Sequence, residues 1–170
     1  MLEDELIGHE FRCETVADTQ RIGESLGERA KAGDVILLNG PLGAGKTTMT
    51  SGIARGMGVK GRVSSPTFTI ARVHRSAGDG PQLIHVDAYR LRDSAEDPHD
   101  VLESLDLDWL VDTSVIVAEW GTGLLESLAP TYYLVDIDRE RAVREDPDSE
   151  ARYVTVTLHQ EGEGCEDPRD

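Results

Sequence analysis

Apolar residues occur along the chain in short runs and in alternating stretches, and these patterns predict a sheet of several strands. Residues 34–39 and 115–118 contain continuous apolar runs typical of buried strands, and the second is predicted to be central. Residues 132–138 and 152–158 alternate between apolar and polar side chains, which predicts two half-exposed strands. Residues 47–57 have a helical pattern and follow the first strand. This order of elements indicates an α/β protein.

The middle of the chain predicts a hairpin. Residues 63–74 are extended in character, and residues 82–87 form a second strand after a glycine-rich turn at residues 77–81. Because a parallel return would need a crossover of about a dozen residues or more, we expect these two strands to be antiparallel. The sheet is therefore expected to be mixed.

Two further helices are predicted outside these strands. Thr15 and Asp18 have the spacing of a capping box, and Gly33 stops the helix that they begin. Residues 98–110 have apolar positions with helical spacing and predict a shorter helix. The apolar residues of the first helix are expected on one face: Val16, Ile22, Leu26 and Ala30.

The stretch from Gly40 to Thr47 matches G-x-x-x-x-G-K-S/T, the phosphate-binding P-loop, and lies between a predicted strand and a predicted helix. Its glycines let the backbone N–H groups turn inward, and the N-terminus of the following helix favours a phosphate. Lys46 would contact the β- and γ-phosphates, and the Thr47 hydroxyl would bind magnesium. The sequence predicts an ATP site in an α/β fold, a single P-loop NTPase domain with a mixed parallel and antiparallel sheet flanked by helices.

Charge and length set limits on partners and domains. The chain has 170 residues with 17 Lys and Arg against 33 Asp and Glu, a formal charge of −16. It lacks the basic surface typical of nucleic-acid binding, so we expect no strong direct binding to RNA. Acidic runs at residues 140–150 and 161–170 predict a loop and a flexible tail. We expect one P-loop ATPase domain over residues 1–160 and an acidic tail over residues 161–170.

Cysteine usage and the N-terminus favour a soluble protein of the cytoplasm. Cys13 and Cys165 lie near opposite ends of the chain, with neither metal-ligand spacing nor a disulfide framework. The first five residues are acidic where a signal peptide would be basic. No apolar run approaches transmembrane length, so no membrane contact is expected.

Two acidic residues that end apolar runs are candidates for magnesium chemistry. Asp87 suits the Walker B role of holding magnesium directly or through water, or it is a strand-ending Asp that accepts backbone hydrogen bonds. Glu119 ends the central strand, where ligands bind in open α/β sheets. It would complete the magnesium shell or act as a base that orients the attacking water. His85 is expected to be packed, because no partner lies at metal spacing, and Trp120 is either a core aromatic or a cover over the nucleotide.

Residues 64–69 follow the P-loop helix, where P-loop switch proteins carry a threonine that senses the γ-phosphate and magnesium. Pro66 fixes the backbone there, and Ser65 and Thr67 offer hydroxyl groups. The same cluster is also typical of a turn that enters a strand, so both interpretations stand. In the first helix, Thr15 or Thr19 is a candidate contact for adenine.

Four motifs in this order resemble the bacterial TsaE family over most of the chain: LGAGKTT at 42–48, SPTFT at 65–69, HVDAYRL at 85–91 and Glu119-Trp120. That family comprises P-loop ATPases needed for the threonylcarbamoyl modification on adenosine 37 of tRNAs that read codons beginning with A. The resemblance implies ATP hydrolysis with magnesium in complex with the proteins TsaD and TsaB. It implies that the ATPase cycle supports turnover of the TsaD–TsaB enzyme and does not itself transfer the threonylcarbamoyl group.

The resemblance also implies a role for individual residues. The implied catalytic residues are Glu119, Asp87 and Lys46, and the implied magnesium ligands are Thr47, Asp87 and Glu119. Thr67 carries over as a switch residue, Thr19 as a first-helix hydroxyl near the nucleotide, and Arg152 as a late basic residue. The implied set for ATP or ADP is Gly43, Ala44, Gly45, Lys46, Thr47, Thr48, Thr67, Thr19, Glu119 and Arg152.

Two positions depart from the family pattern. Pro41 stands where the family usually has Asp, and Gly121 follows the Glu-Trp pair where the family usually has Pro. Pro41 donates no N–H, but that loop position is commonly variable, so binding is expected to survive. Gly121 would loosen the segment after Glu119. Neither change removes a chemical group from the implied mechanism.

Two other functions share the P-loop. One is a nucleotide-gated binding module with negligible hydrolysis, in which ATP orders residues 65–69 for a partner. The other is a small-molecule kinase, which would need arginines on a lid over its acceptor. Arg90 and Arg92 follow Asp87 at once and no inserted lid is visible, so the kinase is the weaker alternative.

Overall fold

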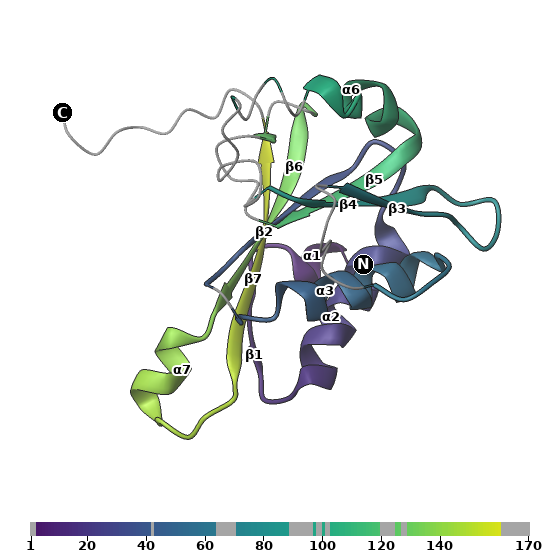
Figure 1. Cartoon of the computed structure of the whole chain (residues 1–170). Coiled ribbons are helices and arrows are strands. Elements are labelled where there is room, and N and C mark those ends of the chain that lie inside the picture. Colours follow the sequence, from purple (N-terminus) through teal and green to yellow (C-terminus); the bar gives the residue numbers. More distant parts are fainter. Residues whose placement is uncertain are drawn as a thin grey trace.

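A computed structural model describes residues 3–41, 43–63, 71–88, 97, 100, 103–119, 125–126 and 129–160. Within these residues one sheet has seven strands in the order β1-β7-β6-β2-β5-β4-β3 (Figure 1). The strands are β1 (Glu10–Cys13), β2 (Val35–Asn39), β3 (Ala71–His74), β4 (Gln82–Asp87), β5 (Ser114–Glu119), β6 (Thr131–Asp138) and β7 (Arg152–Gln160).

The sheet is mixed, as predicted. Strands β6, β2, β5 and β4 are mutually parallel and lie at its centre. The pairs β6–β7, β1–β7 and β3–β4 are antiparallel, which confirms the predicted hairpin. The carboxyl ends of the four parallel strands therefore meet at one edge of the sheet, and the P-loop follows β2 at that edge.

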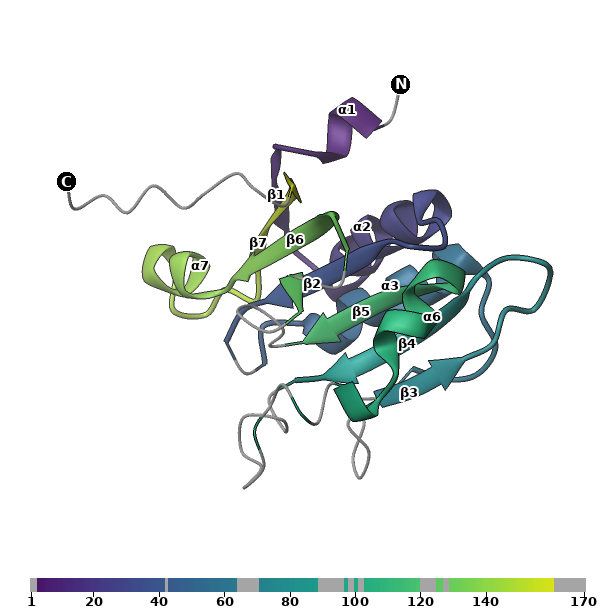
Figure 2. The same cartoon turned by 90° about the horizontal axis from the view of Figure 1, so that it is seen from above.

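Helices cover both faces of the sheet. The described helices are α1 (Glu3–Leu6), α2 (Val16–Arg29), α3 (Lys46–Met57), α6 (Leu107–Leu110) and α7 (Glu140–Glu145), with a 3-10 turn at Val111–Thr113. Helices α2 and α3 lie on one face and α6 lies on the other (Figure 2). Ile36 and Leu38 pack in the core on the α2–α3 side, whereas Val35 and Leu37 pack on the α6 side. Because β2 is buried on both faces, its sequence is a continuous apolar run.

Helices α2 and α3 cross in backbone contact, because glycines line the crossing on both helices. A Cβ atom at Gly27 would lie 2.1 Å from the Ile53 carbonyl oxygen, and one at Gly52 would lie 2.3 Å from the Gln20 carbonyl oxygen. Each helix repeats its glycine after four residues, which keeps the pair on one face. The four glycines are Gly23, Gly27, Gly52 and Gly56. The close crossing fixes α3, which begins at the P-loop lysine, against α2.

Three local predictions are wrong. The acidic run at 140–150 was expected to be a loop, but it contains α7, because Arg141 packs over the Tyr153 ring and Glu145 accepts a 2.6 Å hydrogen bond from the Tyr153 hydroxyl. The helix predicted over 98–110 is not continuous, because Asp106 adopts a left-handed conformation (φ 52°) immediately before α6. Val16, expected on the apolar face of the first helix, is 66% exposed and borders the cavity beside the P-loop instead of packing in the core.

Some predictions fall partly or wholly outside the described residues. These are the expected strand before β3 at residues 64–70, part of the helix at 98–110 and the acidic tail at 161–170. Two elements were not predicted at all, α1 and the edge strand β1.

Candidate functional site

The P-loop joins the carboxyl end of β2 to the first turn of α3. Gly43 (φ 77°) and Gly45 (φ 111°) adopt left-handed conformations that side chains disfavour. Gly45 is also the N-cap of α3, so no side chain caps the first N–H groups of this helix. Uncapped N–H groups at a helix N-terminus form a binding site for an anion.

Lys46 begins α3 and is almost fully buried, at 7% exposure. Its ammonium group donates hydrogen bonds to the carbonyl oxygens of Gly40 (2.7 Å) and Pro41 (2.9 Å), so it reaches back across the loop. Burial lowers the pKa of Lys46, and attraction to the carboxylates of Glu119 and Asp87 partly opposes this change. The lysine therefore lies between the loop and both acidic candidates.

Thr47, Asp87 and Glu119 meet at the carboxyl edge of the sheet. The Thr47 hydroxyl donates a 3.1 Å hydrogen bond to Oε1 of Glu119. Asp87 on β4 is the direct neighbour of Glu119 on β5 in the parallel register, and both residues are buried. Leu83 of β4 packs in the core on the α2–α3 side, and Asp87 follows it at an even spacing, so Asp87 lies on that same face. The structure therefore brings the predicted phosphate ligand Lys46 together with the three predicted magnesium ligands.

The oxygen atoms of Thr47, Asp87 and Glu119 fit a magnesium ion, which prefers hard oxygen ligands. Among the described residues no group of three His, Cys, Asp or Glu side chains could hold a metal ion alone. Magnesium at nucleotide sites usually takes one or two carboxylates and completes its shell with water and phosphate. The residues present fit such an ion together with a phosphate.

His85 lies in the core next to the Glu119 carboxylate. Its side chain is fully buried, and its Nε2 atom lies 3.7 Å from Oε2 of Glu119. Within the part of the chain that the structure describes, neither ring nitrogen has a hydrogen-bond partner. His85 is therefore packed in the core, as predicted, and its ring lies against the buried oxygen of the Glu119 carboxylate.

Arg152 contacts the P-loop from β7. Its Nε atom donates a 2.9 Å hydrogen bond to the Ala44 carbonyl oxygen, and Nη2 lies 3.4 Å from the Gly43 carbonyl oxygen. Burial lowers the pKa of Arg152, and the positive charge of Arg139 lowers it further. Arg152 therefore holds two carbonyl oxygens of the P-loop from the side of β7.

A small cavity of about 70 Å³ lies beside the P-loop, between the start of α2 and the start of β7. Six of the residues predicted as possible contacts of a nucleotide line it: Thr15, Thr19, Ala44, Gly45, Thr48 and Arg152. Sequence reasoning missed three others in this lining, Glu14, Val16 and Glu150. The position of Glu150, two residues before Arg152, was the one available signal, because the contact of Arg152 with the P-loop joins residues far apart in the sequence. Thr67 and Trp120 lie outside the described residues, as does Gly121.

The family model for "Threonylcarbamoyl adenosine biosynthesis protein TsaE" matches residues 13–146, from the last residue of β1 to the residue after α7. The chain belongs to the TsaE family. A TsaE protein of Streptomyces coelicolor is 51% identical over 138 residues, which cover 81% of this chain and 88% of the relative. A TsaE protein of Mycobacterium leprae is 50% identical over 131 residues, covering 76% of this chain and 81% of the relative. Both relatives are named tRNA threonylcarbamoyladenosine biosynthesis proteins.

A solved structure supports the fold of this TsaE chain. The crystal structure of YdiB from Bacillus subtilis superposes with a TM-score of 0.62 at 28% sequence identity. The match covers 89% of this chain and 85% of YdiB. The α/β fold with its mixed sheet, predicted from the sequence, is thereby confirmed.

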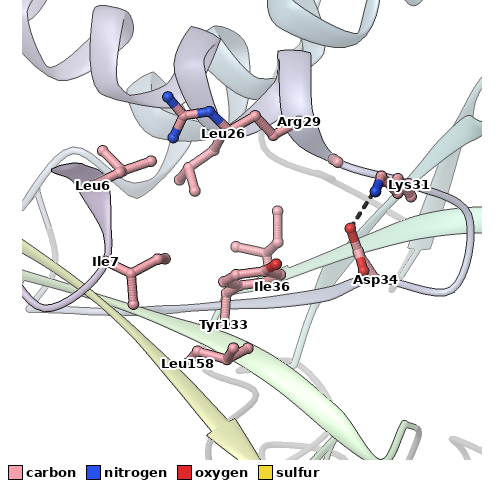
Figure 3. Close-up of a pocket in the computed structure, with 10 residues that line it drawn as sticks. Leu6, Ile7, Leu26, Arg29, Lys31, Asp34, Ile36, Tyr133 and Leu158 are labelled. Atoms are coloured by element: carbon pink, nitrogen blue, oxygen red, sulfur yellow. Dashed lines mark hydrogen bonds between the residues drawn. The ribbon is translucent and has the colours of Figure 1, made fainter. Parts of the chain in front are cut away.

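A second cavity of this TsaE chain lies away from the P-loop. A cavity of about 400 Å³ opens at the opposite end of β2 and is lined in part by Leu6, Leu26 and Ile36 (Figure 3). Among the described helices, none has the length and apolar character needed to cross a membrane.

Proposed function

We propose that this protein is a magnesium-dependent ATPase that acts with the proteins TsaD and TsaB in forming the threonylcarbamoyl modification on adenosine 37 of tRNA. The pathway is suggested by the names of the relatives. The ATPase activity is supported by one observation above all, the hydrogen bond from Thr47 to Glu119 beside Asp87 at the start of the P-loop helix. We also propose that it acts in the cytoplasm, where tRNA is modified.

Phosphate binding is assigned to the P-loop and Lys46, and the distribution of charge supports this. The chain is strongly acidic overall, yet residues 35–78 contain six basic residues and no acidic residue. This segment includes the whole P-loop and α3. A polyanion would therefore approach the loop through the least acidic part of an otherwise repelling surface. ATP and ADP are the proposed ligands.

Magnesium would be held by Thr47 and Asp87, with Glu119 either in its shell or acting on water. When bound, the ion would neutralise charge on the phosphate oxygens. Glu119 is well suited to hold a water molecule, because its carboxylate is buried and already accepts one hydrogen bond from the P-loop helix. Lys46 would bind the phosphates and orient them toward this carboxylate.

Several hydrogen bonds of the site must exchange before hydrolysis. Lys46 donates to the carbonyl oxygens of Gly40 and Pro41, and Thr47 donates to Glu119. A phosphate and a metal ion would take over these donors and acceptors, so the catalytic arrangement depends on the ligand. A partner that promotes this exchange would stimulate hydrolysis.

The same observation supports a second candidate, a nucleotide-gated binding module with negligible hydrolysis. In that case exchange of the Thr47–Glu119 hydrogen bond on ATP binding would change the surface presented to a partner. The remaining members of the proposed nucleotide site, Thr19, Thr48, Arg152 and Thr67, serve both candidates equally. A kinase stays the weakest alternative, since Arg90 and Arg92 follow Asp87 at once and the sequence has no inserted lid.

The test is phosphate release from ATP and magnesium by the purified chain, alone and with the TsaD–TsaB pair. ADP affinity is measured in parallel for the wild-type chain and for Glu119→Gln and Lys46→Ala. We expect Glu119→Gln to leave affinity within about threefold and to lower the rate at least about a hundredfold, because it removes a base but no phosphate contact. Lys46→Ala should weaken affinity itself, because it removes the phosphate-facing charge.

The outcomes separate the candidates. Stimulation by the pair that Glu119→Gln abolishes supports the partner-gated ATPase. Tight ATP binding without phosphate release in either setting would support the binding module. Equal loss of affinity in both variants would contradict the role of Glu119 in acting on water.

A further inference from the structure

The cavity at the amino end of β2 has the size and lining of a ligand site. Its volume of about 400 Å³ lies within the range of roughly 300–1,000 Å³ that is usual for small-molecule pockets. Five elements build its walls, namely α1, α2, β2, β6 and β7 (Figure 3). The apolar part of the lining consists of Leu6, Ile7, Leu26, Ala30, Ile36, Tyr133 and Leu158.

Two cations border this apolar lining. Arg29 is in the last turn of α2, and Lys31 follows two residues later. Neither side chain makes an ion pair with another described residue. The one acidic residue of the lining, Asp34, accepts a 2.7 Å hydrogen bond from the backbone N–H of Lys31 (Figure 3). The cavity therefore combines an apolar interior with a positive border, in a chain whose net charge is −16.

We propose that this cavity binds a small amphipathic anion, an apolar chain or ring that carries one carboxylate. The apolar part would displace water from the lining, which is favourable in proportion to the area covered. The carboxylate would pair with Arg29, whose guanidinium can donate two parallel hydrogen bonds to it, while Lys31 adds positive charge to the border. This site is separate from the P-loop and does not depend on the proposed ATPase.

The distribution of exposed apolar residues favours a small molecule over a protein partner. Within the described residues, the large apolar side chains that are exposed are Val16, Val73 and Leu158. They lie on three separate elements, the first turn of α2, β3 at one end of the sheet, and β7 near the other. Leu158 alone borders the cavity, so among the described residues no continuous patch of exposed large apolar side chains surrounds it as a protein interface would require.

The test is calorimetric titration of the full chain with octanoate, octanol and octylammonium, which share the apolar chain and differ in charge. Octanoate is expected to bind once per chain and at least about tenfold more tightly than octanol, because hydrogen bonds to a charged partner exceed that factor. Octylammonium should bind more weakly than octanol. Saturating ADP should leave octanoate affinity unchanged, because the P-loop lies at the other end of β2.

Two variants locate the site. The double variant Arg29→Gln with Lys31→Gln should weaken octanoate at least about tenfold and leave octanol unchanged. Its matched control is Lys60→Gln with Arg62→Gln, which removes the same charge from exposed positions away from the cavity and should change octanoate affinity less than about twofold. Leu158→Glu, at a position 42% exposed, adds a carboxylate at the mouth of the cavity and should abolish octanoate binding without unfolding the chain.

Four results would overturn the proposal. The first is that the wild-type chain does not bind octanoate, and the second is that it binds octanoate and octanol with equal affinity. The third is an equal loss of octanoate affinity in the Arg29–Lys31 double variant and in its control, and the fourth is displacement of octanoate by ADP. The last result would assign octanoate to the P-loop. Thermal melts of each variant exclude unfolding as the cause of a lost signal.

Discussion

Replacing Gly52 by alanine tests whether the close crossing of α2 and α3 holds the P-loop helix in place. An alanine Cβ at this position would lie 2.3 Å from the Gln20 carbonyl oxygen, whereas ordinary contacts of a Cβ begin at 3.4 Å. The obstructing atom belongs to the backbone, so no side-chain rotation relieves the clash. The two helices must therefore move apart by about 1 Å, a distance that forfeits a quarter to a half of each dispersion contact at the crossing.

Two opposing effects set the size of the change. Alanine is a better helix former than glycine by about 1 kcal/mol, which stabilises the variant. Overpacking in a close-packed interior costs about 1–3 kcal/mol, and a backbone clash belongs at the upper end of that range. We expect a net loss of about 2 kcal/mol in the free energy of unfolding. For a chain of this size the loss corresponds to a fall of about 4–8 °C in Tm.

Urea and thermal unfolding followed by circular dichroism measure this loss. Gly78→Ala is the matched control, because a Cβ there meets no atom within 4 Å, and its stability should change by less than about 1 kcal/mol. Gly27→Ala, with an even shorter distance of 2.1 Å to the Ile53 carbonyl oxygen, should be at least as destabilising as Gly52→Ala. If Gly52→Ala were as stable as the wild-type chain, the backbone contact between the helices would not contribute as we infer.

Two further predictions concern the P-loop. Arg152→Met should weaken ADP binding about tenfold, because it removes a charged donor to the Ala44 carbonyl oxygen worth about 1.5 kcal/mol. Calorimetry measures this change against the exposed control Arg144→Met. An unchanged affinity would show that Arg152 does not order the loop. Burial lowers the pKa of Lys46 below its ordinary value of 10.5, so its ammonium group loses its proton as the pH rises through that lowered value. ADP affinity should therefore fall at a lower pH than it would if Lys46 had the pKa of an exposed lysine. Affinity titrated from neutral to alkaline pH checks this, and the fall should be absent in Lys46→Met.

The sequence alone predicted the parts of the fold that have a strong local signal. The run at residues 34–39 predicted β2, because a strand buried on both faces must be apolar throughout. The short turn before β4 predicted the antiparallel hairpin, because its length excludes a crossover. Thr15 and Asp18 predicted the start of α2, and both hydrogen bonds of that capping box are present. Each of these signals depends only on neighbouring residues.

Features that depend on distant contacts were not predicted. Strand β1 is short and half exposed, and it forms because β7 offers it a free edge. Helix α7 lies in a strongly acidic segment whose composition favours a loop, and contacts with Tyr153 overcome that preference. The glycines of α2 and α3 weaken both helices locally, so their purpose is visible only once the two helices are paired. At the candidate site, the small cavity beside Arg152 is assembled from three separate elements for the same reason.

The candidate nucleotide site is divided between two parts of the molecule. Lys46 and Thr47 belong to α3, which the glycine crossing joins closely to α2, whereas Asp87 and Glu119 belong to the central strands. At the site, a side-chain hydrogen bond from Thr47 to Glu119 joins these two parts. A ligand that takes the Thr47 hydroxyl breaks this hydrogen bond while leaving the helix pair intact. We therefore predict that substitutions in the helix pair change the affinity for a nucleotide, whereas substitutions that move Glu119 change the rate of its hydrolysis.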